Sequence, residues 1–254
     1  MKPMDSRAAG CRGFSLIEAL VGMVVGSIVL AGAYSLWSTH QQNSFLIGKK
    51  IDTHNELTLA SKKLQRAVTL AGLGLGGAAN LDKDDAVGSD TLILFRNPNE
   101  QRSTLVSDAA SGAITIQVDN PSPFVSAGFV AIARDGQGEI RRIASVSGSI
   151  IELVSAFGST YPALGTMVYP AERERYYTDQ DSAIFVREVD GEPYEVARSV
   201  KNFQVSFLDG EGEAAATLAE VRSVRFSLTG TYPAKEGAIN SMNLSSTAIP
   251  RNML

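Results

Sequence analysis

The residue with the greatest potential for chemistry is a carboxylate near the N-terminus. Glu18 is the only charged residue between Phe14 and Trp37, a run of 24 residues without Lys, Arg, Asp, His or Pro. An acidic side chain inside an apolar helix costs about 2.5–3.5 kcal/mol on membrane-insertion scales, so by default it marks a function. In a low-dielectric setting such a charge attracts a cation strongly. Glu18 is therefore the first candidate functional residue.

The other reactive side chains do not form a catalytic set. The two histidines, His40 and His54, are separated by 14 residues of predicted helix, or about 21 Å, and cannot share a metal ion. The only cysteine, Cys11, precedes the apolar run. Ser-His-Asp and Cys-His nucleophile systems are therefore excluded after residue 54. We predict no catalytic residue, no metal site and no cofactor, and we expect that the protein is not an enzyme.

Three further motifs, two acidic loops and one glycine-rich segment, are candidate ligand sites. The acidic loops Asp82–Asp85 and Asp209–Glu213 offer the oxygen ligands that calcium prefers, but neither has the spacing D-x-[DN]-x-[DN]-G. Solvated turns are the favoured interpretation. Gly72–Gly77 matches G-x-G-x-x-G, a fingerprint that binds dinucleotides between a strand and a helix. Here a predicted helix precedes it and a polar loop follows, so the motif is interpreted as a helix stop.

The apolar run is long enough to cross a membrane. Its 24 residues span about 36 Å at about 1.5 Å per residue, against a bilayer core of about 30 Å. Gly22 and Gly26 form a small-xxx-small face for close helix packing, although glycine is also simply commoner in membrane helices. An uncleaved signal anchor is the alternative interpretation. Residues 1–13, which precede the apolar run, are expected to stay in the cytoplasm by the positive-inside rule, because Lys2, Arg7 and Arg12 outnumber Asp5.

The junction Arg12-Gly13-Phe14, followed by Glu18, resembles the N-terminal signature of type IV pilins and type II secretion pseudopilins. The resemblance implies that a prepilin peptidase cleaves after Gly13 and N-methylates Phe14. It also implies that Glu18 of one subunit neutralises the free amine of Phe14 in a neighbour during fibre assembly.

Past Trp37, apolar residues at steps of three and four predict that the helix continues to Ala71 with one face toward the head. That face comprises Ile47, Ile51, His54, Leu57, Ser61, Leu64, Val68 and Ala71, with Asp52, Glu56, Lys63 and Arg66 on the far side. After residue 90, short segments rich in β-branched and aromatic residues predict strands. These are Thr91–Phe95, Ala113–Val118, Phe129–Ala133, Ile140–Val146, Ser149–Val154, Ala183–Val189, Tyr194–Arg198, Phe203–Phe207 and Val224–Leu228. The tail after Lys235 is read as polar with scattered apolar residues.

The expected fold class is α+β: a long N-terminal helical spine, half transmembrane and half amphipathic, packed on a mainly antiparallel β-sheet head. The expected divisions are a cleaved leader (1–13), a transmembrane and polymerisation helix (14–37), its amphipathic continuation (38–71) and an extracytoplasmic head (72–254). The chain would thus be a single-pass inner-membrane protein with a periplasmic head, later assembled into an extracellular fibre.

The head extends the resemblance to PilW-type minor pilins. The similar segments are Leu64–Gly72, Tyr177 with Phe185–Arg187, Val200–Val205, Val221–Leu228, and Ser246-Thr247 followed by Arg251-Asn252. The match is loose from Asn80 to Pro170. The resemblance implies a minor pilin that primes assembly of a type IV pilus with other minor pilins and sits near the fibre tip. Its partners would be prepilin peptidase, other minor pilins, the major pilin and the inner-membrane assembly platform.

Two other functions stay open. A J-type pseudopilin of type II secretion shares the helix and the β-rich head; a mature length near 240 and the Arg251-Asn252 ending favour PilW. A fibre-displayed adhesin or DNA receptor would need an exposed basic cluster. Nucleic acid is not an expected partner, because removing residues 1–13 leaves 20 basic and 26 acidic residues, a net charge of −6. The candidates for such a cluster are Arg134, Arg141, Arg142, Arg173 and Arg175, which Glu139, Glu172 and Glu174 dilute.

Overall fold

The computed structural model describes residues 15–76, 81–82, 90–217 and 220–250. The chain divides into two compact units, Met1–Gly48 and Lys49–Leu254. A 55-residue helix, α1 (Leu16–Leu70), belongs to both. Its bounds confirm the helix predicted from the apolar run and from the amphipathic spacing that follows it.

In the first unit, α1 is mostly apolar on all sides up to Trp37, and the polar residues 38–44 follow. Within α1, an 18-residue window reaches a mean hydropathy of 2.2 with none of its residues buried, so by length and composition the helix can cross a membrane. Leu16, Val24 and Leu30 are all exposed. The Ser27 hydroxyl is satisfied within the helix, because it donates to the carbonyl of Val24 at 2.8 Å.

The second unit contains a ten-stranded antiparallel sheet. Its central strand, β8 (Met167–Asp179), pairs with β2 (Thr91–Arg96), β3 (Ser103–Thr104), β5 (Phe129–Arg134) and β9 (Ile184–Val189). The main strand order is β1-β2-β8-β5-β6-β7-β4, with β10 added on β9. The remaining strands are β1 (Leu81–Asp82), β4 (Thr115–Gln117), β6 (Gln137–Ser147), β7 (Ile150–Leu153) and β10 (Glu192–Arg198).

Strand β8 contributes to three hydrophobic clusters, through Val168, Ala171 and Tyr176. Its second half pairs with β2 and β9, whereas its first half pairs with β3 and β5. Between β2 and this first half lies an inserted lobe, residues 97–168, which has a buried cluster of its own that includes Ile132, Phe157 and Val168. The sequence predicted no strand at 167–176, because its polar residues Glu172–Arg175 interrupt any apolar pattern.

A second sheet has the order β11-β12-β13 and is antiparallel. Its strands are β11 (Val200–Leu208), β12 (Ser223–Pro233) and β13 (Ile239–Ala248), and the short 3-10 helix η2 (Lys235–Gly237) precedes β13. The sequence predicted only a polar tail with scattered apolar residues after Lys235, whereas the structure has strand β13 there. On β13, Ala248 is buried in the core and Met242 and Leu244 pack against it, whereas most of the other side chains of the strand are polar and exposed.

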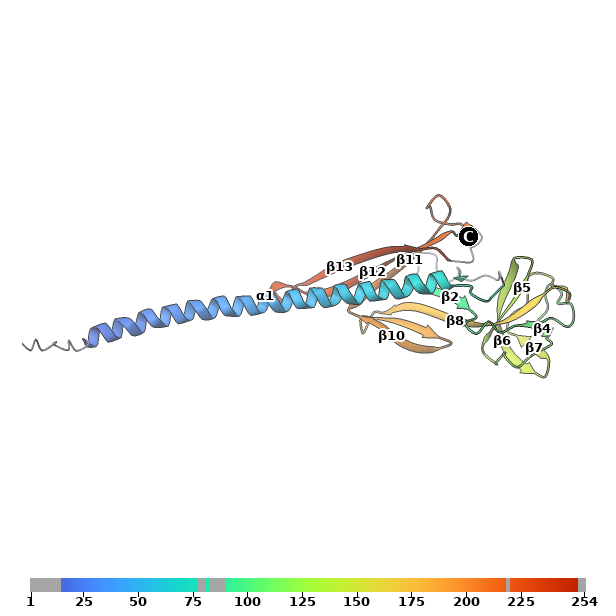
Figure 1. Ribbon diagram of the computed structural model, residues 1–254, viewed down its shortest axis with the longest axis horizontal. Coiled ribbons are helices and arrows are strands. Elements are labelled where there is room, and N and C mark those ends of the chain that lie inside the picture. Colours follow the sequence, from blue (N-terminus) through green and yellow to red (C-terminus); the bar gives the residue numbers. More distant parts are fainter. Residues whose placement is uncertain (1–14, 77–80, 83–89, 218–219, 251–254) are drawn as a thin grey trace, which may run out of the picture. The chain divides into compact units, whose positions relative to one another are not determined.

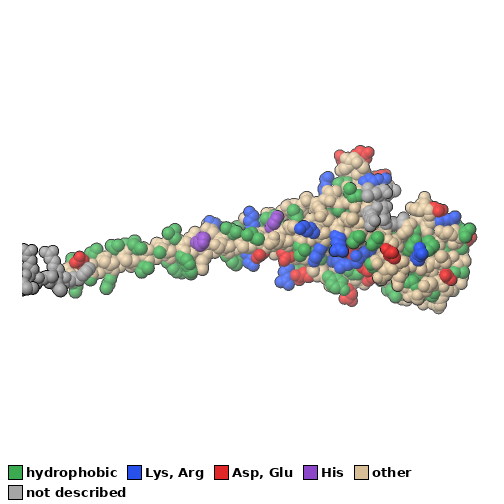
Figure 2. All heavy atoms as spheres, viewed as in Figure 1, with side chains coloured by type: hydrophobic (Ala, Val, Ile, Leu, Met, Phe, Trp, Pro, Cys, Tyr) green, Lys and Arg blue, Asp and Glu red, His purple; other side chains and the backbone are tan. Residues whose placement is uncertain are grey.

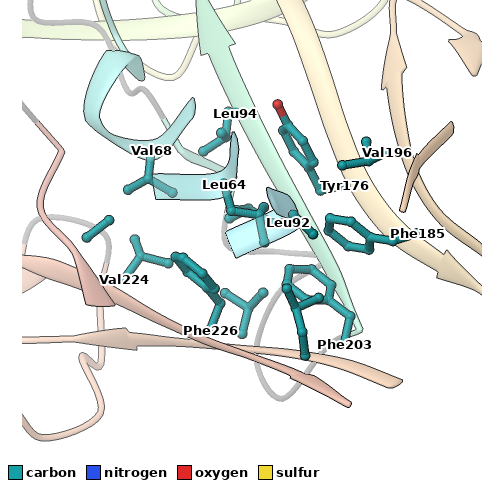
Figure 3. Close-up of a cluster of buried hydrophobic side chains, with 14 of the residues drawn as sticks. Leu64, Val68, Leu92, Leu94, Tyr176, Phe185, Val196, Phe203, Val224 and Phe226 are labelled. Atoms are coloured by element: carbon teal, nitrogen blue, oxygen red, sulfur yellow. The ribbon is translucent and has the colours of Figure 1, made fainter. Parts of the chain in front are cut away.

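The second half of α1 buries one face against both sheets. Leu57, Leu64 and Val68 are fully buried with side chains from β2, β8, β9, β10, β11 and β12 (Figures 1 and 3). Phe185 and Phe203 stack edge to face at 5.0 Å between ring centroids in this core. The predicted face was wrong at its start, because Ile47, Ile51 and His54 are exposed and burial begins at Thr53.

The helix approaches the second sheet at a glycine. A Cβ at Gly230 of β12 would lie 2.7 Å from Cγ2 of Thr53 and 3.0 Å from Cδ1 of Leu57. The absence of a side chain there lets the strand come close to the helix. The fold is therefore α+β, one long N-terminal helix packed on a mainly antiparallel β-domain, as the sequence predicted.

Candidate assembly site and the charged groups of the head

Glu18 lies in the first turn of α1. Its backbone N–H donates to the carbonyl of Ser15 at 3.0 Å, and the N–H of Ala19 donates to the same oxygen at 3.1 Å. A carboxylate in the first turn is favoured by the helix dipole and by the unpaired N–H groups there. The side chain is exposed, and no ion pair among the described residues involves it. Glu18 is thus available to a cation from outside the chain.

Gly22 and Gly26 lie four residues apart on one face of α1, and both are open. A Cβ built at either position meets no heavy atom within 4 Å. Exposed apolar side chains surround them, including Val21, Met23 and Val25; Figure 2 shows this apolar surface along the first part of the helix. The geometry permits the close approach of a second helix at this face.

The proposed processing residues Gly13 and Phe14 lie outside the described residues, as does Cys11. Cleavage and methylation at this junction therefore stay predictions.

A comparison with protein families agrees with the N-terminal reading. Residues 9–34 match the model of the prokaryotic N-terminal methylation motif. The match covers Gly13, Phe14, Glu18, Gly22 and Gly26. It supports a type IV pilin-like or pseudopilin protein, with processing by prepilin peptidase and an association with the membrane.

The comparisons with whole proteins add no function. No curated protein matches the chain. Three solved structures each match 28% of it: the Gp54 tailspike of Acinetobacter baumannii bacteriophage AP22 (17% identity, TM-score 0.25), the tailspike gp61 of Pseudomonas phage phi297 (24%, 0.23) and the tailspike gp49 of Pseudomonas phage LKA1 (19%, 0.24). The matched part spans only 14–15% of each tailspike chain. At such low TM-scores, these similarities indicate neither the fold nor the function of this chain.

The other ligand candidates have structural partners or lie outside the described residues. Asp209 Oδ1 accepts from the backbone N–H groups of Glu211 at 3.0 Å and Glu213 at 2.9 Å, so its carboxylate holds the turn. The loop Asp82–Asp85 falls outside the described residues apart from the backbone of Asp82. Among the described residues, no group of three or more His, Cys, Asp or Glu side chains could hold a metal ion. His40 and His54 are both exposed.

The glycine motif after α1 forms a tight connection. Gly72, Gly74 and Gly76 all have positive φ, and the Gly72 N–H donates to the carbonyl of Phe95 at 2.7 Å. A Cβ at Gly74 would lie 2.7 Å from the carbonyl oxygen of Asn97. The motif ends the helix and joins it to the end of β2, whereas a dinucleotide site needs a helix after the glycines.

The structure shows one charged cluster that the sequence did not predict. Glu174 of β8 is 2% exposed; its Oε1 forms an ion pair with Nη2 of Arg96 at 2.6 Å and accepts a hydrogen bond from Nη2 of Arg187 at 2.6 Å. Its Oε2 accepts from the Tyr176 hydroxyl at 2.8 Å. The hydrogen bond that Arg187 donates to Glu174 raises the pKa of Arg187, and burial followed by the Glu174 charge raises the pKa of Tyr176. Both groups therefore stay protonated and keep the buried carboxylate compensated.

This cluster links the consecutive strands β8 and β9 to β2, which is distant from them in sequence. Arg96 lies on β2, Glu174 and Tyr176 on β8, and Arg187 on β9. A signal was present in the alternation of Glu and Arg from Glu172 to Arg175. Only the register shows which of these side chains turns inward, because Glu174 meets Arg96, 78 residues before it in the chain, and Arg187, 13 residues after it.

The five arginines considered for a basic receptor surface do not act as one free cluster. Arg134 pairs with Asp135, Arg141 with Glu139, and Arg175 with Glu188. The Arg173 guanidinium lies 5.8 Å from the ring centroid of Phe129, and Arg142 is exposed on β6. Neighbouring carboxylates neutralise three of the five charges.

Proposed function

We propose that this chain is a PilW-like minor pilin that primes assembly of a type IV pilus together with other minor pilins and remains near the fibre tip. The observation that carries the proposal is an exposed apolar helix with Glu18 in its first turn, within a segment that matches the N-terminal methylation motif. Cleavage after Gly13 would place a free amine at Phe14, four residues from Glu18.

In this mechanism Glu18 acts between subunits. The carboxylate of one subunit attracts the Phe14 amine of a neighbour, and the low dielectric of packed apolar helices strengthens the attraction. Gly22 and Gly26 allow the helices to approach closely enough for this pairing. The charge pair would then select the axial register of the fibre.

A minor role is supported by features of the head. The mature sequence has no cysteine, so no disulfide stabilises the head, and the inserted lobe of residues 97–168 enlarges it. A fibre built from one subunit type places each head against identical heads, which favours compact domains. These features suit a subunit used in few copies beside unlike neighbours.

Quantitative proteomics of sheared fibres tests this role. We expect the protein at a small fraction of the main subunit, and we expect deletion of its gene to reduce surface pili strongly while major pilin remains in the membrane. Abundance equal to that of the main subunit would refute a minor role. Normal piliation with lost protein secretion in the deletion strain would assign the chain to type II secretion, the J-type alternative.

A further inference from the structure

A pocket with a volume of about 280 Å³ lies between the last turns of α1 and strands β8, β9 and β10. Lys63 and Arg66 line it from the helix, and Arg187 lines it from β9. Tyr194 of β10, which is 54% exposed, lines it as well. In Figure 2, Lys and Arg side chains gather over this part of the head.

The cations of this pocket differ in their partners. Arg187 is committed to the buried carboxylate of Glu174. Lys63 and Arg66 are exposed, and within the described part of the chain neither side chain forms an ion pair or a hydrogen bond. They lie three residues apart, so their Cβ atoms are about 5–6 Å apart on one helix face. Two uncommitted cations therefore face one hollow.

The helix dipole does not explain this placement, because its effect falls off within the last turn of a helix and α1 has no basic residue in its last turn. Lys62 is also exposed, but it does not line the pocket. The dipole accounts neither for the hollow nor for the exposed tyrosine beside the cations.

The charges around the pocket indicate the size of its occupant. Its lining holds three cations, Lys63, Arg66 and Arg187, and two carboxylates, Glu174 and Glu195. Glu195 is 43% exposed at its side chain and pairs with Arg198. A continuous polyanion such as a nucleic acid backbone would meet these carboxylates, whereas one or two carboxylates from a short loop can reach the free cations.

We propose that this pocket, named here the Lys63–Arg66 pocket, binds an acidic loop from the head of a neighbouring subunit. The carboxylates pair with Lys63 and Arg66, while the ring of Tyr194 and the partly apolar floor, Ala67 and Val196, cover the loop backbone. This chain's own acidic loop has the same chemistry and serves as the probe for such a loop: Glu211 and Glu213 lie exposed on the turn that Asp209 holds. Charge complementarity of this type gives specificity and faster association.

The inference rests on the proposed function only in that the neighbour is another fibre subunit. Binding is measured by fluorescence anisotropy with the full-length protein in detergent micelles and a labelled peptide of residues 208–216. We expect saturable binding that weakens as salt rises and that is lost when Glu211 and Glu213 of the peptide are replaced by Gln. Lys63→Glu with Arg66→Glu should raise the Kd at least tenfold.

Lys62→Glu is the matched control, because it reverses a charge on the same helix outside the pocket; we expect it to leave the Kd within twofold. Thermal unfolding monitors the fold of each variant. The proposal is overturned if the peptide does not bind at millimolar concentration, if Lys62→Glu weakens binding as much, or if a DNA duplex binds more tightly through the same two residues. These outcomes are independent of piliation, so they separate this inference from the role of Glu18.

Discussion

At the scale of single residues, Glu18 and Glu174 show two ways of placing a carboxylate in an apolar setting. Glu174 is buried within the head and compensated by two guanidinium groups and a hydroxyl. Glu18 lies on an apolar helix with no such partner among the described residues. A charge that the fold compensates serves the fold, whereas one left without a partner points to an interaction outside the chain.

We therefore expect Glu18→Val to reduce assembly and leave the fold intact. The substitution removes the counter-charge for a neighbouring amine, and it makes membrane insertion more favourable by about 2.5–3.5 kcal/mol. Surface pili should fall strongly in a strain that lacks the wild-type copy, while the amount of membrane-inserted protein is unchanged. Electron microscopy and membrane immunoblots measure both quantities. Normal piliation would contradict the proposed role of Glu18.

The contribution of Asp190 to the stability of the fold is expected to depend on pH. Burial, with the nearby charges of Glu172 and Glu174, raises the pKa of this carboxyl above its ordinary value of 3.8. The carboxyl therefore stabilises the fold most below pH 3.8, and this contribution is lost as the pH rises through its folded pKa. Asp190→Asn should remove that loss, because the amide oxygen can still accept from the Arg173 N–H at 3.0 Å.

The measurement is the free energy of unfolding of the detergent-solubilised protein from pH 3.5 to 7. The difference between Asp190→Asn and wild type should grow in favour of the variant as the pH rises. Asp135→Asn is the matched control, because Asp135 also has a positive φ before a glycine. A difference between Asp190→Asn and wild type that stays constant across this pH range would contradict a raised pKa of the Asp190 carboxyl.

At the scale of elements, α1 is two structures in one helix. The helix is mostly apolar all round and exposed up to Trp37, and its second half buries one face against both sheets of the head. Under the proposed function, polymerisation depends on the first stretch and head packing on the second. Substitutions in one half should be separable in effect from substitutions in the other.

Gly230→Ala tests the contact between α1 and the second sheet. The added Cβ would meet Thr53 and Leu57 at 2.7 and 3.0 Å, so we expect a loss of about 1–3 kcal/mol in stability from overpacking. Gly210→Ala is the control, since a Cβ there meets nothing within 4 Å. Urea unfolding of both variants checks the prediction, and equal midpoints would show that helix and strand can separate at little cost.

At the scale of the whole molecule, the proposal requires that the mature chain differs from the translated one. Removing residues 1–13 discards Cys11 and three of the basic residues, and it creates a new amine at Phe14. Assembly would then begin only after processing, since the amine that pairs with Glu18 does not exist before cleavage.

The expected mature protein begins with N-methylated Phe14. Intact-mass analysis of membrane-extracted protein should give the mass of residues 14–254 plus one methyl group. Gly13→Leu should block cleavage, because the bulky side chain occupies the processed junction, whereas Gly10→Leu in the same leader should not. A mature chain that still contains Cys11 would refute the cleavage site.

The sequence by itself determined the features that depend on local order. Apolar residues define the first part of α1, and three- and four-residue spacing defines the second. Short runs of β-branched and aromatic residues predicted strands that the structure contains, among them β2, β5 and β9. The N-terminal motif was also readable, because its residues lie within one short segment that a family model matches.

Only the tertiary structure decided the features built from residues far apart in the chain. Strands β8 and β13 carry too many polar residues to be predicted alone, and they are strands because both find partners along their length. The inward position of Glu174 depends on its register against β2 and β9. Likewise, the buried face of α1 begins at Thr53, and not at Ile47, because that is where β12 reaches the helix at Gly230. Periodicity shows that a helix has an apolar face, but the partner surface determines how much of that face is buried.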